Sequence, residues 1–383
     1  MKFFLFFSLI SLTFFTASAQ GNFSGNDGIY INIPSSQTNT SGDIANYINK
    51  HFDSDGKKVA AIYNWITRNI TYNADSIHYV ILDEDNEERV TYALRRKKGV
   101  CENFAAIFNN LCSKCGIPSF YIEGFTKQLG AIDRTPHVWC AAFVDGEWNF
   151  YDPTWDAGYV RSGNFFNNSQ TKFFKISPRE FIQTHLPFDP LFQFLSYPVS
   201  YKEFVKGNLD EHDPKRFFNY KDSIDAFKKM DKLSQYLSTI SRIKNEGWPA
   251  SKIDTKLKRV QLEVEVINQD TDMSLYDSAV EDYNKAVQLL NSFIVYRNNQ
   301  FQPMKTTDEV EKDFKNILKL ITSADLKLKK VNQSKATLVL DTGDIQKKLD
   351  ELSSKLKDQE AFFKNNFSEA KTNQNISKTD STD

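Results

Sequence analysis

The sequence predicts an α+β domain at about residues 42–205, followed by an all-α helical bundle or coiled-coil-like domain at about 215–368. All four cysteines and four of the five tryptophans lie between residues 60 and 160, where helix patterns lead into strand patterns. Beyond residue 220 the chain is rich in Lys, Asp and Leu, and its apolar residues recur at helical spacing. Residues 20–41 form a lead-in, and the polar tail at 369–383 is expected to be disordered.

Two apolar stripes predict helices in the first domain. One runs from Val59 to Ile70, and Ser54 or Asp55 is available to cap its start. The other covers residues 101–115 and ends at a Gly-Ile-Pro breaker. Cys101 is therefore expected at the first turn of a helix.

Strand patterns follow at residues 119–125, 138–144 and 147–151. Asp145-Gly146 between the last two predicts a two-residue hairpin turn. With Val144 and Glu147 paired across that turn, His137 and Asp152 become diagonal neighbours on one face, about 7–8 Å apart at the backbone. Since this face is apolar, we expect it to pack on the helix that starts at Cys101.

A thiol, an imidazole and a carboxylate are thus expected at one point. The positive end of a helix dipole favours the nucleophilic thiolate of Cys101. His137 takes the thiol proton, and Asp152 fixes the tautomer and orientation of that histidine. Backbone N–H groups at the start of the helix are candidates for part of an oxyanion hole, and we identify no side-chain donor to complete it.

The other cysteines are weaker candidates. Cys140 projects to the strand face opposite His137. Cys112 and Cys115 form a C-x-x-C, for which buried thiols, a local disulfide and a metal site all remain open. No cofactor-binding motif or metal-ligand spacing is found, so no cofactor and no metal are predicted.

The same residues lie in an ordered set of motifs. The set is Trp65-Ile66, Ile70-Thr71-Tyr72, Lys98-Gly99-Val100-Cys101-Glu102-Asn103-Phe104-Ala105, Leu111-Cys112, Gly116-Ile117-Pro118, His137-Val138-Trp139, Asp152-Pro153-Thr154-Trp155, and downstream Ser177-Pro178, Phe181, His185-Leu186-Pro187 and Ser196-Tyr197-Pro198. It resembles the transglutaminase-like superfamily, with similarity to its kyphoscoliosis-peptidase-like branch, over about residues 45–205.

The resemblance implies a papain-like transglutaminase core, in which a helix bearing the cysteine packs on an antiparallel sheet. It also implies Cys101 as nucleophile, His137 as general base and Asp152 as the orienting residue. Cross-linking transglutaminases of animals have Gly-Gln before the nucleophile and Trp after it, whereas this chain has Val100 and Glu102. That departure weakens an assignment to protein cross-linking.

Residues 1–19 have the pattern of a secretory signal peptide. Lys2 precedes an apolar stretch at 3–16, and Ala-Ser-Ala at 17–19 supplies the small residues of a cleavage point. The stretch is shorter than the roughly 20 apolar residues that cross a bilayer. We expect cleavage after Ala19 and a secreted or periplasmic product with no integral membrane segment.

The helical half contains stripes of apolar residues separated by breakers. The stripes cover residues 227–240, 253–267, 280–294, 310–321 and 345–356, and the breakers are 247–249, 270–272, 298–303 and 341–343. Short connections favour antiparallel helices in a bundle. The alternative, one long two-chain coiled coil, requires an uninterrupted pattern.

Two functional hypotheses follow. The first is an exported thiol enzyme that acts on amide bonds of proteins or peptides by hydrolysis, deamidation or transamidation through a thioester. The second is a catalytically silent scaffold whose helical domain binds a protein partner. Lys and Arg total 48 and Asp and Glu total 49, which argues against nucleic acid as a partner.

Overall fold

The computed structural model describes residues 31–76, 86–207, 209, 217–333 and 340–379. The chain divides into two compact units, 1–255 and 256–383. The predicted signal peptide at 1–19 lies outside the described residues. A search of the described helices finds none with the length and hydropathy needed to span a membrane.

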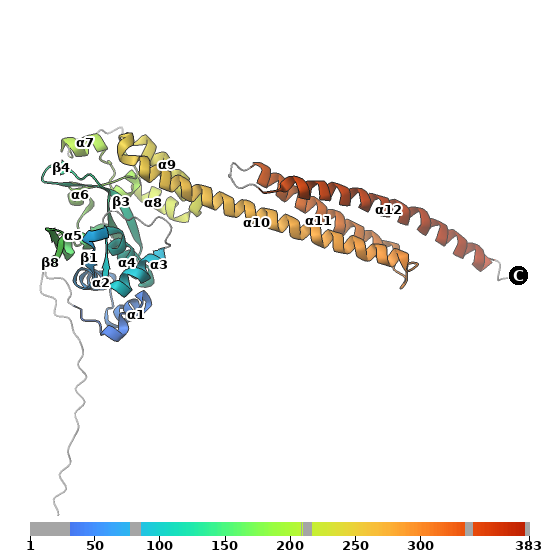
Figure 1. Cartoon of the computed structure of the whole chain (residues 1–383), viewed down its shortest axis with the longest axis horizontal. Helices are drawn as coiled ribbons and strands as arrows, with labels where there is room; N and C mark the ends of the chain where they lie inside the picture. The colour runs from blue at the N-terminus through green and yellow to red at the C-terminus, as the bar shows by residue number, and fades with distance from the viewer. Residues whose placement is uncertain (1–30, 77–85, 208, 210–216, 334–339, 380–383) are drawn as a thin grey trace, which may run out of the picture. The chain divides into compact units, whose positions relative to one another are not determined.

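The first unit is an α+β domain (Figure 1). Its α-helices are α1 (Ser41–His51), α2 (Asp55–Asn69), α3 (Asn86–Arg96), α4 (Cys101–Lys114), α5 (Pro153–Ala157), α6 (Pro178–Phe181), α7 (Tyr201–Lys206), α8 (Tyr220–Lys229), α9 (Lys232–Asn245) and the start of α10 (Ala250–Asn298). Its 3₁₀-helices are η1 (Ser35–Gln37), η2 (Ala74–Ser76) and η3 (Pro190–Gln193).

The strands of this unit form one larger sheet and two small ones. They are β1 (Thr71–Tyr72), β2 (Lys98–Gly99), β3 (Ser119–Gln128), β4 (Ala131–Ile132), β5 (His137–Val144), β6 (Glu147–Tyr151), β7 (Gly158–Arg161), β8 (Asn164–Asn167) and β9 (His185–Pro187). The larger sheet has the antiparallel order β4-β3-β5-β6, and β9 also pairs with β3. β1 pairs with β2, and β7 with β8.

The predicted hairpin is confirmed. Val144 pairs with Glu147, and the register continues to Cys140 opposite Tyr151. Asp145 and Gly146 have φ of +55° and +82°, the left-handed pair that a type I′ turn requires. The predicted strand that began at Ser119 is also present and continues to the end of β3.

Different elements pack on the two faces of the sheet. One face carries the even-numbered residues of β5, from Val138 to Val144, and packs in the core cluster that includes α2 and α4. The other face, with Trp139 and Ala141, packs on the aromatic residues of α6 and η3 and on α8. The expectation that the face of His137 packs on the Cys101 helix is therefore wrong. The helix covers the opposite face, because it is the small Cys140 and Ala142 that allow its close approach.

Helices α8 and α9 belong to the first unit, and Ile224 and Phe227 of α8 are buried in its aromatic face. The compact units thus divide after Thr255, within α10, whereas the sequence places the start of the helical domain at about 215. The stripe predicted at 227–240 is two helices. The carboxylate of Asp231 caps α9, because it accepts the N–H of Ser234 at 2.7 Å.

The second unit contains the rest of α10 with α11 (Thr307–Gln333) and α12 (Thr342–Thr379). One apolar cluster joins the three helices, built on residues such as Ala286, Phe314 and Leu352. The predicted breaks at 247–249 and 298–303 are confirmed, but α10 continues through 270–272. The low helix propensities of Asp and Thr cost little, so three such residues do not end a helix that continues on both sides. The helix α12 covers most of the segment for which a disordered tail is predicted.

Candidate active site

Cys101 is the first residue of α4 and is half-buried. The start of the helix is fixed locally, because the N–H of Val100 donates to Asn103 Oδ1 at 2.9 Å. Gly99 leaves room for this, since a Cβ there would lie 2.5 Å from the Cβ of Asn103. The thiol is thereby held at the positive end of the helix dipole, as expected.

His137 is the first residue of β5 and pairs with Gly124 of β3. It is 8% exposed. Its Nε2 lies 2.8 Å from Asp152 Oδ2, and the same imidazole is hydrogen-bonded to the Cys101 side chain. Asp152 and Cys101 are therefore both partners of this imidazole. The structure therefore brings the three predicted residues together.

The route to this arrangement differs from the prediction. β6 ends at Tyr151, and Asp152 is the N-cap of α5, where its Oδ1 accepts the N–H groups of Thr154 and Trp155 at 3.0 and 3.1 Å. His137 reaches Cys101 at the end of β5 and not through its face. The strand lies along α4, as the contact of Cys140 Sγ with Ala105 O at 3.5 Å shows, so the first residues of both elements are neighbours.

A second histidine, His185 of β9, also contacts Asp152 and was not predicted as a site residue. Its Nε2 lies 3.3 Å from Asp152 Oδ2, and its Nδ1 lies 2.8 Å from Thr184 Oγ1. Both His185 and Asp152 are fully buried. The available sequence signal is the His185-Leu186-Pro187 motif within the family resemblance.

The two histidines have opposite shifts. Burial alone would lower the pKa of His137, but the Asp152 carboxylate and Cys101 outweigh it and raise the pKa to about 10. Burial lowers the pKa of His185 to about 4, and Asp152 offsets only part of that effect. Burial would raise the pKa of Asp152, but both histidines together hold it well below its usual range.

The other three cysteines are buried free thiols, so Cys112 and Cys115 do not form a disulfide with each other in this structure. Burial raises the pKa of Cys115 to about 11, and it raises the pKa of Cys112 and of Cys140 well above the usual range. These thiols are therefore poor nucleophiles. Cys101 differs from them in its partial exposure and in its contact with an imidazole.

A protonated phenol also lies beside the thiol. Tyr72 of β1 pairs with Gly99, and its ring lies 6.4 Å from that of Phe104 in the first turn of α4. Burial raises the pKa of Tyr72 to about 12, and Cys101 and Asp152 add to this shift. The hydroxyl therefore keeps its proton and remains a hydrogen-bond donor.

In the described part of the chain, His137, Asp152 and His185 form the one group of three or more metal-type ligands, with ligand atoms within 4.8 Å of one another. The distances of 2.8 and 3.3 Å from both nitrogens to Asp152 Oδ2 are hydrogen-bond distances. We therefore interpret the group as a hydrogen-bonded cluster.

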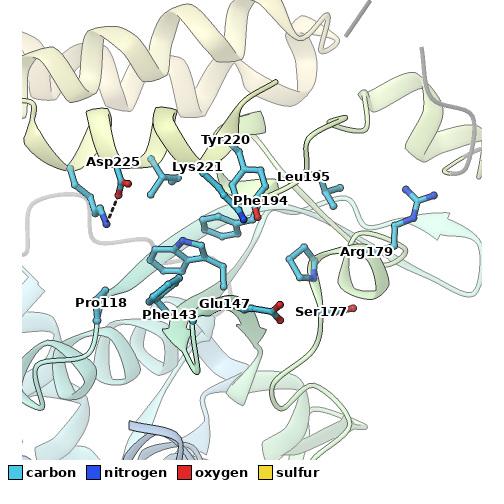
Figure 2. A pocket seen from close by; sticks show the side chains of 15 residues that line it. Pro118, Phe143, Glu147, Ser177, Arg179, Phe194, Leu195, Tyr220, Lys221 and Asp225 are labelled. Carbon is cyan, nitrogen blue, oxygen red and sulfur yellow. Dashed lines mark ion pairs between the residues drawn. The ribbon is translucent and has the colours of Figure 1, made fainter. Parts of the chain in front are cut away.

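A cavity of about 590 Å³ lies away from these residues, between the β5–β6 hairpin and α8 (Figure 2). Phe143, Trp148, Phe194 and Tyr220 are among its lining residues, and none of the three predicted site residues is. Phe143 is six residues along β5 from His137, or about 20 Å in a strand. The cavity is therefore separate from the thiol site.

Comparison with known proteins agrees with the geometry. Residues 42–153 match the transglutaminase-like superfamily. Kyphoscoliosis peptidase of Mus musculus is 28% identical over 160 residues, which are 39% of this chain and 24% of that protein. Hillarin of Drosophila melanogaster is 27% identical over 199 residues, which are 46% of this chain and 24% of that protein. The chain thus spans about a quarter of the length of these relatives.

Among solved structures, a crystal structure of a TGase is 19% identical and covers 32% of this chain and 34% of that chain, with a TM-score of 0.24. The family match and the observed core of helix α4 on an antiparallel sheet agree with the fold implied by the sequence motifs.

Proposed function

We propose that the transglutaminase-like domain of this chain is a thiol enzyme that transfers the acyl group of an amide bond in a protein or peptide. The observation that carries the proposal is the position of one imidazole between Cys101 and the buried carboxylate of Asp152. A raised pKa of His137 favours a thiolate–imidazolium pair, which is the reactive form of such a site.

Each step has a residue to perform it. The thiolate of Cys101 attacks the amide carbon, and the oxygen of the resulting tetrahedral intermediate faces the N–H groups at the start of α4. As the C–N bond breaks, the imidazolium of His137 gives its proton to the leaving nitrogen, and a thioester on Cys101 remains. Water or an amine then attacks the thioester while His137 takes one proton, and the sulfur leaves as a thiolate, which yields the acid or the new amide and restores the thiolate–imidazolium pair.

Within this class we favour hydrolysis over transamidation. Val100 and Glu102 flank the nucleophile in place of the Gly-Gln and Trp of cross-linking transglutaminases. The proposed setting is outside the cytoplasm, which the signal pattern in residues 1–19 supports. The helical unit at 256–383 is the proposed contact for a protein partner.

Selective alkylation tests the activated thiol. We expect substoichiometric iodoacetamide at neutral pH to label Cys101 before the three buried cysteines, as read by peptide mass spectrometry of the folded chain. Cys101→Ala removes this labelling, and Cys140→Ala is the matched control that retains it. Equal labelling of all four cysteines would overturn the proposal.

The reaction type is tested with peptide and amine libraries, comparing the native chain with Cys101→Ala by mass spectrometry. Cleaved peptides mean hydrolysis of a peptide bond. Products that have lost ammonia and gained an amine mean transamidation, and products in which water replaces ammonia mean deamidation. Absence of any Cys101-dependent product with any library member counts against an acyl-transfer enzyme.

A further inference from the structure

We infer that His185 is a positioning residue of this site: as a neutral imidazole it holds the Asp152 carboxylate in the orientation that faces His137. The inference rests on the proposed function, because it assigns a role within the same site. It concerns a residue that touches neither the thiol nor a substrate, and that acts through Asp152.

The first argument is the number of hydrogen bonds that the carboxylate accepts. Oδ1 accepts the N–H groups of Thr154 and Trp155, and Oδ2 accepts from His137 at 2.8 Å and from His185 at 3.3 Å. The two backbone bonds alone fix one oxygen. The two imidazoles fix the other from two directions, so rotation of the carboxylate breaks at least one of them.

The second argument is that the ring of His185 is itself held. It stacks on Phe181 with ring centroids 3.9 Å apart, and it contacts Trp139 at 5.0 Å and Trp155 at 4.6 Å. Its backbone pairs with Thr126 in β3. A ring enclosed in this way provides a fixed donor and not an adaptable one.

Gly124 makes this placement possible. A Cβ at this position would lie 2.0 Å from the carbonyl oxygen of Leu186 and 2.7 Å from the Trp139 ring. Only glycine therefore lets β9 lie against β3 and lets Trp139 fill the space beneath. The pairing is what brings His185, 33 residues after Asp152, to the carboxylate.

The third argument is the protonation state of His185. The charged or titratable groups that act on it are Asp152, His137 and Asp133, and burial outweighs their combined effect, so that its pKa falls to about 4. Its single proton lies on Nε2, which faces the carboxylate. Nδ1 is then the acceptor, and the Thr184 hydroxyl 2.8 Å away is its donor, closer than the alternative acceptor of that hydroxyl, Phe181 O at 3.4 Å.

A neutral imidazole at His185 is suited to positioning Asp152. A charged second imidazolium would repel the imidazolium of His137, whose ring centroid is 6.0 Å away, and would compete with it for the carboxylate. A neutral N–H donor stabilises the anion without adding charge. Asp152 therefore remains ionised and oriented, and the positive charge stays on the side of the thiol.

The test measures the second-order rate of iodoacetamide alkylation at Cys101 as a function of pH in the full chain. We expect His185→Phe, which keeps a ring but removes the donor, to slow alkylation at neutral pH by about ten- to a hundredfold, as for loss of one hydrogen bond to a charged group. The acid limb of the profile moves to higher pH, because the carboxylate loses a donor that stabilises its anion. His185→Gln, whose amide nitrogen can donate in place of Nε2, restores most of the rate.

Two further comparisons keep the test decisive. The exposed His51 gives the matched control, and His51→Phe keeps the native profile. Thr184→Val leaves the His185 ring in place but removes the tautomer-fixing hydroxyl, so we expect a slowing of about two- to fivefold, which Thr184→Ser reverses. If His185→Phe does not fold, as judged by circular dichroism, Thr184→Val and Thr184→Ser test the inference in its place.

The outcomes separate the two proposals. If the native chain shows no selective reaction at Cys101, the proposed function fails. If the native chain reacts selectively and a folded His185→Phe keeps the native rate and acid limb, the inference is overturned and the proposed function stands. A His185→Gln profile as slow as that of His185→Phe would also overturn it, because a merely structural role of the ring would then explain both. For the Thr184 pair, native rates in Thr184→Val contradict it.

Discussion

The two sides of the Asp152 carboxylate contain the same kind of residue in opposite states. On one side His137 has a raised pKa and contacts a half-buried thiol. On the other side His185 has a lowered pKa and is enclosed by Phe181 and other aromatic rings. Both imidazoles offer Nε2 to the same oxygen, Oδ2.

The difference teaches that burial and the shared carboxylate do not decide the charge by themselves. The distance to the carboxylate, 2.8 Å for His137 and 3.3 Å for His185, and the second contact of each ring both contribute. His137 also contacts Cys101, a group that gains from a positive neighbour when it is a thiolate. His185 has a neutral hydroxyl from Thr184 on its other nitrogen, and the charge of Asp133 does not offset the desolvation of an imidazolium.

The largest effect is expected from removing the charge that both histidines share. Asp152→Asn retains an N-cap for α5, since Asn caps helices as well as Asp, and it is therefore compatible with folding. Without the anion, the imidazolium of His137 loses its stabilisation and the tautomer is no longer fixed. We expect a loss of about 10⁴-fold in acyl transfer, comparable to the same change in a serine-protease triad.

The measurement is the Cys101-dependent turnover of a peptide found in the library screen, with Cys101 alkylation as a second readout. Asp231→Asn changes the cap of α9, far along the chain, and provides the control. A native turnover rate in a folded Asp152→Asn would remove the basis of the comparison, since the carboxylate would then not control either histidine.

An intermediate effect is expected from removing one of the aromatic rings that enclose His185, which leaves the surroundings of His137 unchanged. Phe181 is 2% exposed and stacks on His185 and, at 4.5 Å, on Phe150. Phe181→Ala should lower the free energy of unfolding by about 3–5 kcal/mol, because it leaves a cavity in the core. The cavity lets water reach His185, so the pKa of this histidine should move back toward 6.5.

Urea unfolding measures the loss of stability, and NMR titration of the imidazole protons measures the histidine. Phe166, which is 46% exposed, gives the control, and Phe166→Ala should change the unfolding free energy by at most about 0.5 kcal/mol. A stable Phe181→Ala in which His185 still does not titrate near neutral pH would show that the enclosure does not set its protonation.

Local sequence patterns are enough to predict the side of Asp152 that contains His137 and Cys101. The hairpin at Asp145-Gly146 and the helix start at Cys101 depend on neighbouring residues, and they brought His137 close to the thiol. The face that packs on α4 was predicted wrongly, because both faces of β5 are apolar and alternation alone does not tell which one a helix covers. Asp152 was placed correctly in space but its capping of α5 was missed.

The position of His185, on the other side of Asp152, depends on contacts between segments that are distant in the sequence. His185 reaches Asp152 because β9 returns to β3 past Gly124, and a three-residue strand has no periodicity from which pairing is predicted. The continuous α10 was missed for a different reason. Residues 270–272 resemble a loop by composition, but the helix continues on both sides of them, and their low propensity does not interrupt it.

The smallest effect is a change in how stability depends on pH. The pKa of His185 is about 4 in the folded chain against an ordinary 6.5, so between these values the unfolded chain binds a proton that the folded chain excludes. This histidine therefore makes the unfolding free energy fall as pH is lowered from 6.5 to 4, by at most about 1.4 kcal/mol per pH unit. Asp156 acts in the opposite sense, because burial raises its pKa from 3.8 to about 6.

The native curve is therefore expected to be flat in this range, and the contribution of His185 is read from a difference. His185→Gln removes the contribution of His185 to the pH dependence of the unfolding free energy and leaves the contribution of Asp156. The native chain should therefore lose its stability advantage over this variant gradually as pH falls from 6.5 to 4. Urea unfolding at half-unit steps measures it, and the exposed His51→Gln should run parallel to the native curve. Parallel curves for His185→Gln would mean that His185 is protonated in the folded chain, and the two sides of Asp152 would then carry the same charge.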